Sequence, residues 1–122
     1  MASREKASAL SPSGTEFGAW LRELRESKGA IQRTAAAAAD MDSSHLGKVE
    51  RGERFPTIEQ ADALARFFGH DKVDLRLRLM AAKMLAECDG DHALAHSVAG
   101  LVQEAAAPYL VDNPVNKRPK KK

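Results

Sequence analysis

The stretch that most constrains this chain of 122 residues is QRTAAAAADMDSSHLGKVERG, residues 32–52, because it predicts two short helices joined by a tight turn. Strong helix formers fill residues 32–39, and residues 43–50 follow Asp42, which is a good N-cap residue. Asp40 tolerates the left-handed backbone that a tight turn needs, and Met41 is the large apolar side chain available to fill the corner. We therefore expect a helix, a turn and a second helix within this stretch.

The second of these helices has two chemically different faces. Leu46 and Val49 share one side, and an apolar side of a short helix must turn inward. The opposite side holds small or polar residues, namely Ser43, Ser44, Gly47 and Lys48, with His45 at its edge. A face of this kind suits a groove in DNA.

The residues around this stretch add a recognisable order and spacing. They are the run Leu21 to Arg25 (LRELR), then Gln32, Ala36 and Met41, the block Val49 to Gly52 (VERG), Pro56, and Ala63 to Ala65 followed by Phe68 and Gly69. With them, residues 17–69 resemble the Cro/repressor-type helix-turn-helix, also called the xenobiotic-response-element (Xre) type. The sequence departs from the family pattern at Ile31, where Ser or Thr is usual, at Ala35, where Leu is usual, and at Asp40, where Gly is usual.

The resemblance implies roles for individual residues. It pairs Arg25 with Glu50 in a partly buried ion pair that would lock the reading helix to the scaffold, with two solvated surface charges as the alternative. It gives Gln32 a backbone phosphate to hold and a base-reading side chain to support. The residues it implies for DNA binding are Gln32, Arg33, Ser43, Ser44, His45, Gly47, Lys48, Arg51, Arg54 and Thr57.

Two further helices complete the predicted DNA-binding unit, residues 13–69. The first starts at Ser13 or Thr15 and ends at Lys28-Gly29, and its apolar stripe is Phe17, Leu21 and Leu24. The second is capped by Thr57 and ends at Gly69. Its stripe should close the core and consists of Ile58, Ala61, Leu64, Ala65 and Phe68.

Residues 70–112 predict a hairpin of two helices joined by the turn Asp89-Gly90-Asp91. Residues 73–79 alternate as a strand would, but the stripe that continues to Met84 and Cys88 favours a helix. The second helix is expected from about His92 to Ala107, because Pro108 ends it. We expect this extension to dimerise through Val73, Leu77, Met80, Met84, Leu94, Val98 and Leu101.

Charge and composition limit the possible classes. The formal net charge is +2, and five basic residues lie in residues 117–122, so residues 1–116 carry a net charge of −3. DNA binding must therefore be argued from where the charges lie.

We expect residues 1–12 to be a disordered arm and residues 113–122 a disordered basic tail. The tail is either merely solvated, an anchor for DNA phosphates or a nuclear-import signal. The single Cys88 excludes an internal disulfide, and the sequence has neither a secretion signal nor a membrane span, so a cytoplasmic protein is expected. The family resemblance implies that it is a nucleoid-associated protein of a bacterium or phage.

No catalytic motif is present. Cys88, His92 and His96 recur every four residues, but Gly90 interrupts their helix and a fourth ligand is missing, so we expect no metal site and no cofactor.

The expected fold is all-α, a five-helix lambda-repressor-like helix-turn-helix domain with a C-terminal helical hairpin extension. The expected function is that of a sequence-specific transcriptional regulator, a repressor, that reads the major groove of double-stranded DNA as a homodimer and is not an enzyme. The alternatives are an antitoxin that binds its toxin through residues 70–112, and an interaction module that has lost DNA binding.

Overall fold

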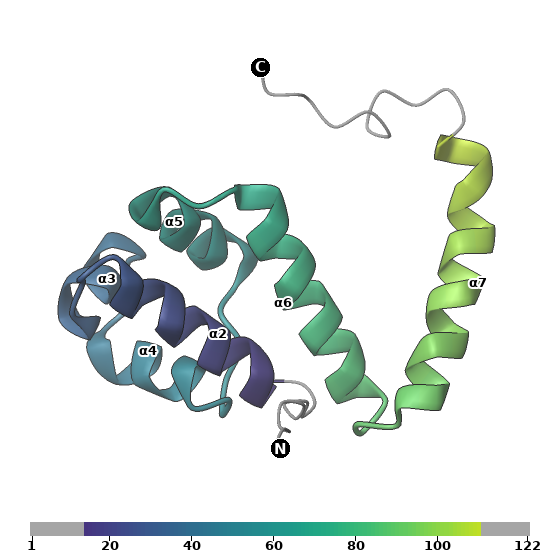
Figure 1. The fold of residues 1–122 in the computed structure, drawn as a ribbon, viewed down its shortest axis with the longest axis horizontal. Helices are drawn as coiled ribbons and strands as arrows, with labels where there is room; N and C mark the ends of the chain where they lie inside the picture. Colours follow the sequence, from purple (N-terminus) through teal and green to yellow (C-terminus); the bar gives the residue numbers. More distant parts are fainter. Residues whose placement is uncertain (1–13, 111–122) are drawn as a thin grey trace. The chain divides into compact units, whose positions relative to one another are not determined.

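The computed structural model describes residues 14–110; the predicted arm (residues 1–12), the Ser13 cap and the predicted tail (residues 113–122) lie outside the described residues. The chain divides into two compact units, residues 1–90 and 91–122, and each is described by itself. Within the described residues every regular element is a helix (Figure 1), which confirms the all-α prediction. The helices are α2 (Gly14–Ser27), α3 (Gln32–Ala38), α4 (Ser43–Glu50), α5 (Ile58–Phe68), α6 (Lys72–Glu87) and α7 (His92–Leu110). No helix between residues 14 and 110 has the length and apolar character that a membrane crossing requires.

The core of the first unit lies between α2, α3, α4, α5 and α6. Four of these helices contribute fully buried leucines, which are Leu21, Leu46, Leu64, Leu75 and Leu79. The remaining helix, α3, contributes Ala35 and Ala36, and both are buried. Small side chains on α3 leave room for its backbone to lie close to its neighbours α4 and α5, with which it packs.

Local signals set both ends of α5 as predicted. The Thr57 hydroxyl accepts a hydrogen bond from the Gln60 backbone N–H at 3.0 Å, and the Gln60 side chain accepts one from the Thr57 N–H at 3.0 Å. This capping box starts α5, and Gly69, with a φ of 67°, ends it in the left-handed conformation. By contrast, α3 starts after Ile31, whose side chain makes no capping hydrogen bond.

Helix α6 corrects the predicted boundary of the DNA-binding unit. The sequence analysis ended that unit at Gly69, but Leu75, Leu79 and Ala82 of α6 are buried in the same core as α2 to α5. The first unit therefore extends to Gly90. Figure 1 shows α6 starting beside α5 and continuing past α2, and it packs against both. Periodicity could not reveal this, because apolar residues occupy two sides of α6 and the first part of the stripe chosen from the sequence, Val73, Leu77 and Met80, is exposed.

Helix α7 is longer than the sequence analysis expected. It runs to Leu110, and Pro108, which was predicted to end it, lies inside it. A proline removes only its own N–H, so the two residues that follow it keep their donors and can complete a last turn. Most residues of α7 are exposed.

Candidate nucleic-acid interface

The two helices of the motif are joined by the turn that the sequence predicted. Asp40 has a positive φ of 59°, and the Met41 side chain is buried in the core, with an exposed fraction of 9%. The Met41 backbone N–H donates to the carbonyl of Ala36 at 3.0 Å, so the chain reverses immediately after α3. The turn therefore holds α3 and α4 in a helix-turn-helix arrangement.

Asp42 fixes the start of α4. Its carboxylate accepts hydrogen bonds from the His45 backbone N–H at 2.9 Å and from the Ser44 hydroxyl at 3.2 Å. These two hydrogen bonds lower the pKa of Asp42 below its ordinary value, and the bond from the His45 backbone has the larger effect. An ionised side chain at this end also complements the helix dipole.

Buried residues fix the rotation of α4 about its own axis. Leu46 and Val49 are fully buried, as predicted. Glu50, also buried, accepts hydrogen bonds from Arg25 of α2, at 2.7 Å from Nε and 3.0 Å from Nη2. Arg25 also donates from Nη1 to the carbonyl of Ala30 at 2.9 Å. The structure thus contains the predicted Arg25–Glu50 pair in a buried, bidentate form, and the hydrogen bond to Glu50 raises the pKa of Arg25.

The same carboxylate also holds α3. Gln32 donates from Nε2 to Glu50 Oε1 at 2.9 Å, so Glu50 connects α2, α3 and α4. The side-chain amide of Gln32 is partly buried, and this hydrogen bond orients it. One Nε2 hydrogen is used within the protein, and the other remains as a donor, which is what a phosphate contact requires.

The position of Gly47 differs from the prediction. The sequence analysis placed it on the outward face of α4, but it is buried. A Cβ atom on Gly47 would lie 3.3 Å from Arg51 Nη1 and 3.7 Å from Gln32 Oε1, so these two side chains cover the glycine. The reason is that residues 47, 50 and 51 lie on adjacent parts of the helix surface, beside the Arg25–Glu50 pair. Gly47 therefore makes room for Gln32 and Arg51.

The exposed face of α4 is small and polar. Ser43, Ser44 and Lys48 are exposed, and Lys48 forms no ion pair with any residue between 14 and 110. His45 lies at the edge of this face and is partly buried, and its Nε2 is buried without a hydrogen-bond partner among the described residues. Ser44, Lys48 and His45 line a hollow of about 450 Å³ beside this face.

The remaining predicted contacts lie around α4. Arg33 on α3 is exposed, as are Arg54 and Thr57 in and after the loop that follows α4. Arg54 lines the same hollow as Lys48. The Thr57 hydroxyl is already used in the capping box, so its side chain is partly committed to the protein.

Sequence reasoning missed the acid at Glu53. Its carboxylate accepts a hydrogen bond from Arg51 Nε at 2.9 Å, and both side chains are exposed. The spacing Arg-Gly-Glu was visible in the sequence and could have suggested the pair, because Gly52 turns the chain at a positive φ of 81°.

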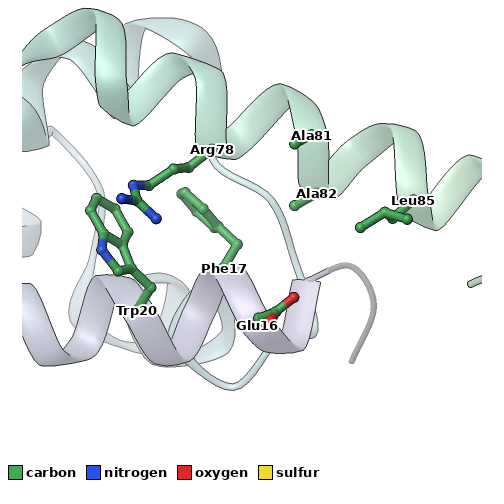
Figure 2. A pocket seen from close by; sticks show the side chains of 7 residues that line it. All are labelled: Glu16, Phe17, Trp20, Arg78, Ala81, Ala82 and Leu85. Atoms are coloured by element: carbon green, nitrogen blue, oxygen red, sulfur yellow. The ribbon is translucent and has the colours of Figure 1, made fainter. Parts of the chain in front are cut away.

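A second hollow, of about 390 Å³, lies between α2 and α6 (Figure 2). The Arg78 guanidinium carbon lies 4.5 Å from the ring centroid of Trp20, and Arg78 Nε donates to Asp74 at 2.9 Å. Phe17 faces the same space and belongs to the core. Because the lining side chains come from α2 and α6, this hollow is separate from the exposed face of α4.

Comparison with known proteins gives matches to a family and to solved structures. A family described as "Helix-turn-helix domain" matches residues 16–79, which is more than half of the chain. No curated protein matches. The restriction-modification controller protein C.AhdI from Aeromonas hydrophila is 38% identical over 50% of this chain and 88% of its own, with a TM-score of 0.47. The clp gene regulator ClgR from Corynebacterium glutamicum is 25% identical over 73% of this chain and 88% of its own, with a TM-score of 0.48.

The family match covers the motif and its flanking helices, from the third residue of α2 into α6. Within that range, the chain has the turn, the capped second helix and the buried Arg25–Glu50 pair. The chain belongs to the helix-turn-helix family of DNA-binding transcriptional regulators, of the Cro/repressor (Xre) type that its sequence resembles.

Proposed function

We propose that this protein is a sequence-specific repressor that reads the major groove of double-stranded DNA with α4. The observation that carries the proposal is the contrast between the two sides of this helix. Leu46, Val49 and Glu50 hold one side in the core, while Ser44 and Lys48 project from the other. A short helix with a fixed orientation and a small polar outer face fits the geometry of a recognition helix.

The proposed contacts fall into two groups. Ser43, Ser44, His45 and Lys48 lie where base edges would be read, and a lysine suits the acceptors of guanine. The flanking phosphates would be held by Gln32, Arg33, Arg51, Arg54 and the backbone amides that follow Thr57. Gly47 is removed from the first group, because it is covered by protein. Its proposed role is to accommodate Gln32 and Arg51 at the edge of the groove.

Local charge has to supply the affinity for DNA. Residues 14–110 contain 15 acidic and 12 basic side chains, so the described part of the protein has a net charge of −3. Lys48 and Arg54 lie beside the same hollow and form no ion pair within that part. Their charges are therefore available to neutralise phosphates even though the whole domain is not basic.

We further propose that two copies of the chain bind together. On α6 the side opposite the core carries Val73, Leu77 and Met80, which are 38%, 60% and 53% exposed. On α7, Leu94 and Leu101 are 48% and 66% exposed. Single exposed apolar residues are common, but a stripe of them along each helix indicates a surface on each unit that another protein covers. A second copy is the preferred partner, because a two-fold dimer doubles the contact on a palindromic site.

Selection of bound duplexes from random DNA, followed by titration of the selected site, tests the proposed function. We expect one preferred sequence, bound more tightly than unrelated DNA of the same length, with an affinity that falls steeply with salt. Selection that yields no preferred sequence, together with no salt-dependent binding, would contradict the proposal.

Sedimentation of the full chain and footprinting on the selected site test the dimer. We expect a dimer at micromolar concentration and two protected half-sites with centres about 34 Å apart. Leu77→Glu with Met80→Glu should give a folded monomer, because both side chains are exposed in the first unit. The matched control is Lys83→Glu, an exposed residue of the same helix.

A monomer that still binds the operator would instead favour a different protein partner for residues 70–112. An antitoxin that holds its toxin through this extension is the candidate of that kind. Copurification of one small unrelated protein, bound to the full chain and lost after truncation behind Gly90, would support it. The truncation must follow Gly90 because α6 belongs to the core of the first unit.

A further inference from the structure

Arg51 and Glu53 form an ion pair directly after α4. Arg51 Nε donates to Glu53 Oε2 at 2.9 Å, and Nη2 donates to Oε1 at 3.4 Å, so the carboxylate occupies one edge of the guanidinium. Hydrogen bonding between them raises the pKa of Arg51 and lowers the pKa of Glu53. Both groups are therefore charged at neutral pH, and their charges compensate one another.

The pair lies at the edge of the proposed DNA-binding face. Arg51 Nη1 lies over Gly47 beside the Gln32 amide, and these residues line one hollow of about 240 Å³. Gln32, whose amide lies over the same glycine, is also proposed as a phosphate ligand. Arg51 is thus placed where a DNA phosphate would come within its reach.

The other cations near this face differ from Arg51 in one respect. Lys48 and Arg54 form no ion pair with any residue in 14–110, whereas Arg51 is paired with a carboxylate. The edge of Arg51 that Glu53 occupies is one of the edges that grips phosphate oxygens in a bidentate manner. A phosphate must compete with Glu53 for it.

We propose that Glu53 sets the affinity of this protein for DNA by competing with a backbone phosphate for Arg51. This inference rests on the proposed function and deepens it. In the free protein, Glu53 neutralises the charge of Arg51, so the closed pair has little attraction for a DNA phosphate. When the pair opens, the phosphate replaces the carboxylate on the guanidinium, and the exposed Glu53 side chain turns to solvent. Exposed ion pairs are weak, so DNA can open this one.

Titration of the selected operator and of an unrelated duplex, at several salt concentrations, tests the proposal with four forms of the full chain. These are wild type, Glu53→Gln, Arg51→Ala and the double variant. Glu53→Gln should tighten binding to both duplexes by roughly two- to fivefold, since an exposed pair has about that strength. It should also make the slope of log affinity against log salt steeper, by up to about one, because the net positive charge beside the DNA phosphates rises by one. In the Arg51→Ala background, Glu53→Gln should change the affinity by less than about 1.5-fold, because no guanidinium is left to release.

The comparison between backgrounds separates this proposal from a general repulsion between Glu53 and DNA. Equal tightening in the presence and absence of Arg51 would show repulsion and overturn the competition. Weaker binding by Glu53→Gln would show instead that Glu53 positions Arg51, and would also overturn it. The control is Glu23→Gln, which removes an exposed carboxylate of α2 that belongs to neither proposed binding surface and lines neither hollow beside α4, and it should leave DNA binding unchanged.

Failure of this proposal can be told apart from failure of the proposed function. If the wild-type chain binds the operator and Glu53→Gln has no effect, only the competition is wrong. If wild type and all variants fail to bind any duplex, both the proposed function and the competition are wrong.

Discussion

Two arginine–carboxylate pairs meet at the end of α4, and adjacent residues take part in them. Glu50 pairs with Arg25, and the two side chains are 3% and 10% exposed. Arg51 pairs with Glu53, and their side chains are 60% and 53% exposed. The inner pair has additional hydrogen bonds to Gln32 and to a backbone carbonyl, whereas the outer pair has none beyond its own. The comparison shows one short helix with a buried pair that fixes its orientation and an exposed pair directly after it, which we propose DNA can open.

Removal of Arg25 should have the largest effect on stability. Arg25→Ala leaves the Glu50 carboxylate buried without its cation, and the loss of one partner of a buried pair costs about 3–5 kcal/mol. Chemical denaturation should show this loss, and Arg22→Ala, an exposed arginine on the same helix, should change stability by ~0.5 kcal/mol or less. If both variants change the free energy of unfolding by a similar small amount, the Arg25–Glu50 pair contributes no more to stability than an exposed pair does, and the comparison fails.

Substitution of two glycines tests how tightly each side of α4 is packed. A Cβ atom on Gly18 of α2 would lie 2.4 Å from the carbonyl oxygen of Val49, which is backbone and cannot move aside. Gly18→Ala should therefore lower the free energy of unfolding by about 1–3 kcal/mol. Gly47→Ala meets only the ends of the Arg51 and Gln32 side chains, and it should be neutral or stabilising by up to ~1 kcal/mol through helix propensity.

The outcome that would contradict this account is an equal loss for both alanine variants. It would mean that the Gln32 and Arg51 side chains are held as rigidly as the α4 backbone. A rigidly held Arg51 could not move from Glu53 to a DNA phosphate, and the proposed competition would be wrong. Gly47→Ala should also weaken DNA binding, since it displaces both proposed phosphate ligands, and titration of the operator measures this.

Acid should have a small effect that comes from the exposed start of α4. The pKa of Asp42 is lower in the folded protein than its ordinary value, so the ionised carboxylate stabilises the fold above about pH 4. This contribution is lost as the pH falls through the folded pKa. Asp42→Asn keeps the cap, because Asn also accepts the backbone N–H, but it does not titrate. Between pH 5 and pH 2.5 the melting temperature of the wild type should fall by a few degrees more than that of the variant. Parallel curves would show that the Asp42 charge contributes nothing.

Much of the first unit could be predicted because its signals are local. Asp42 and Thr57 cap α4 and α5, Gly69 ends α5, and all of them act within four residues of themselves. The inner side of α4 was predicted because Leu46 and Val49 differ clearly from their neighbours. The Arg25–Glu50 pair was implied by the resemblance to the family, since residues 25 positions apart cannot be paired from periodicity.

The features that were missed depend on packing between helices. Gly47 looks like a surface residue until Gln32 of α3 is placed over it. The core side of α6 could not be chosen, because Leu75 and Leu77 are neighbours of the same type and only α2 and α5 decide which of them is buried. Gly18 gave no signal either, since the close approach of α2 to the end of α4 depends on the whole arrangement.

The central claim is that the outer side of α4 reads DNA while its inner side holds the fold. The double variant Ser44→Ala with Lys48→Ala tests it most directly, by operator preference and thermal unfolding measured on the same sample. Both side chains are exposed, so we predict that preference for the selected operator over unrelated DNA is lost while the melting temperature stays within about two degrees of the wild type. A melting temperature lowered as far as that of Arg25→Ala, or operator preference that survives the double substitution, would contradict the account.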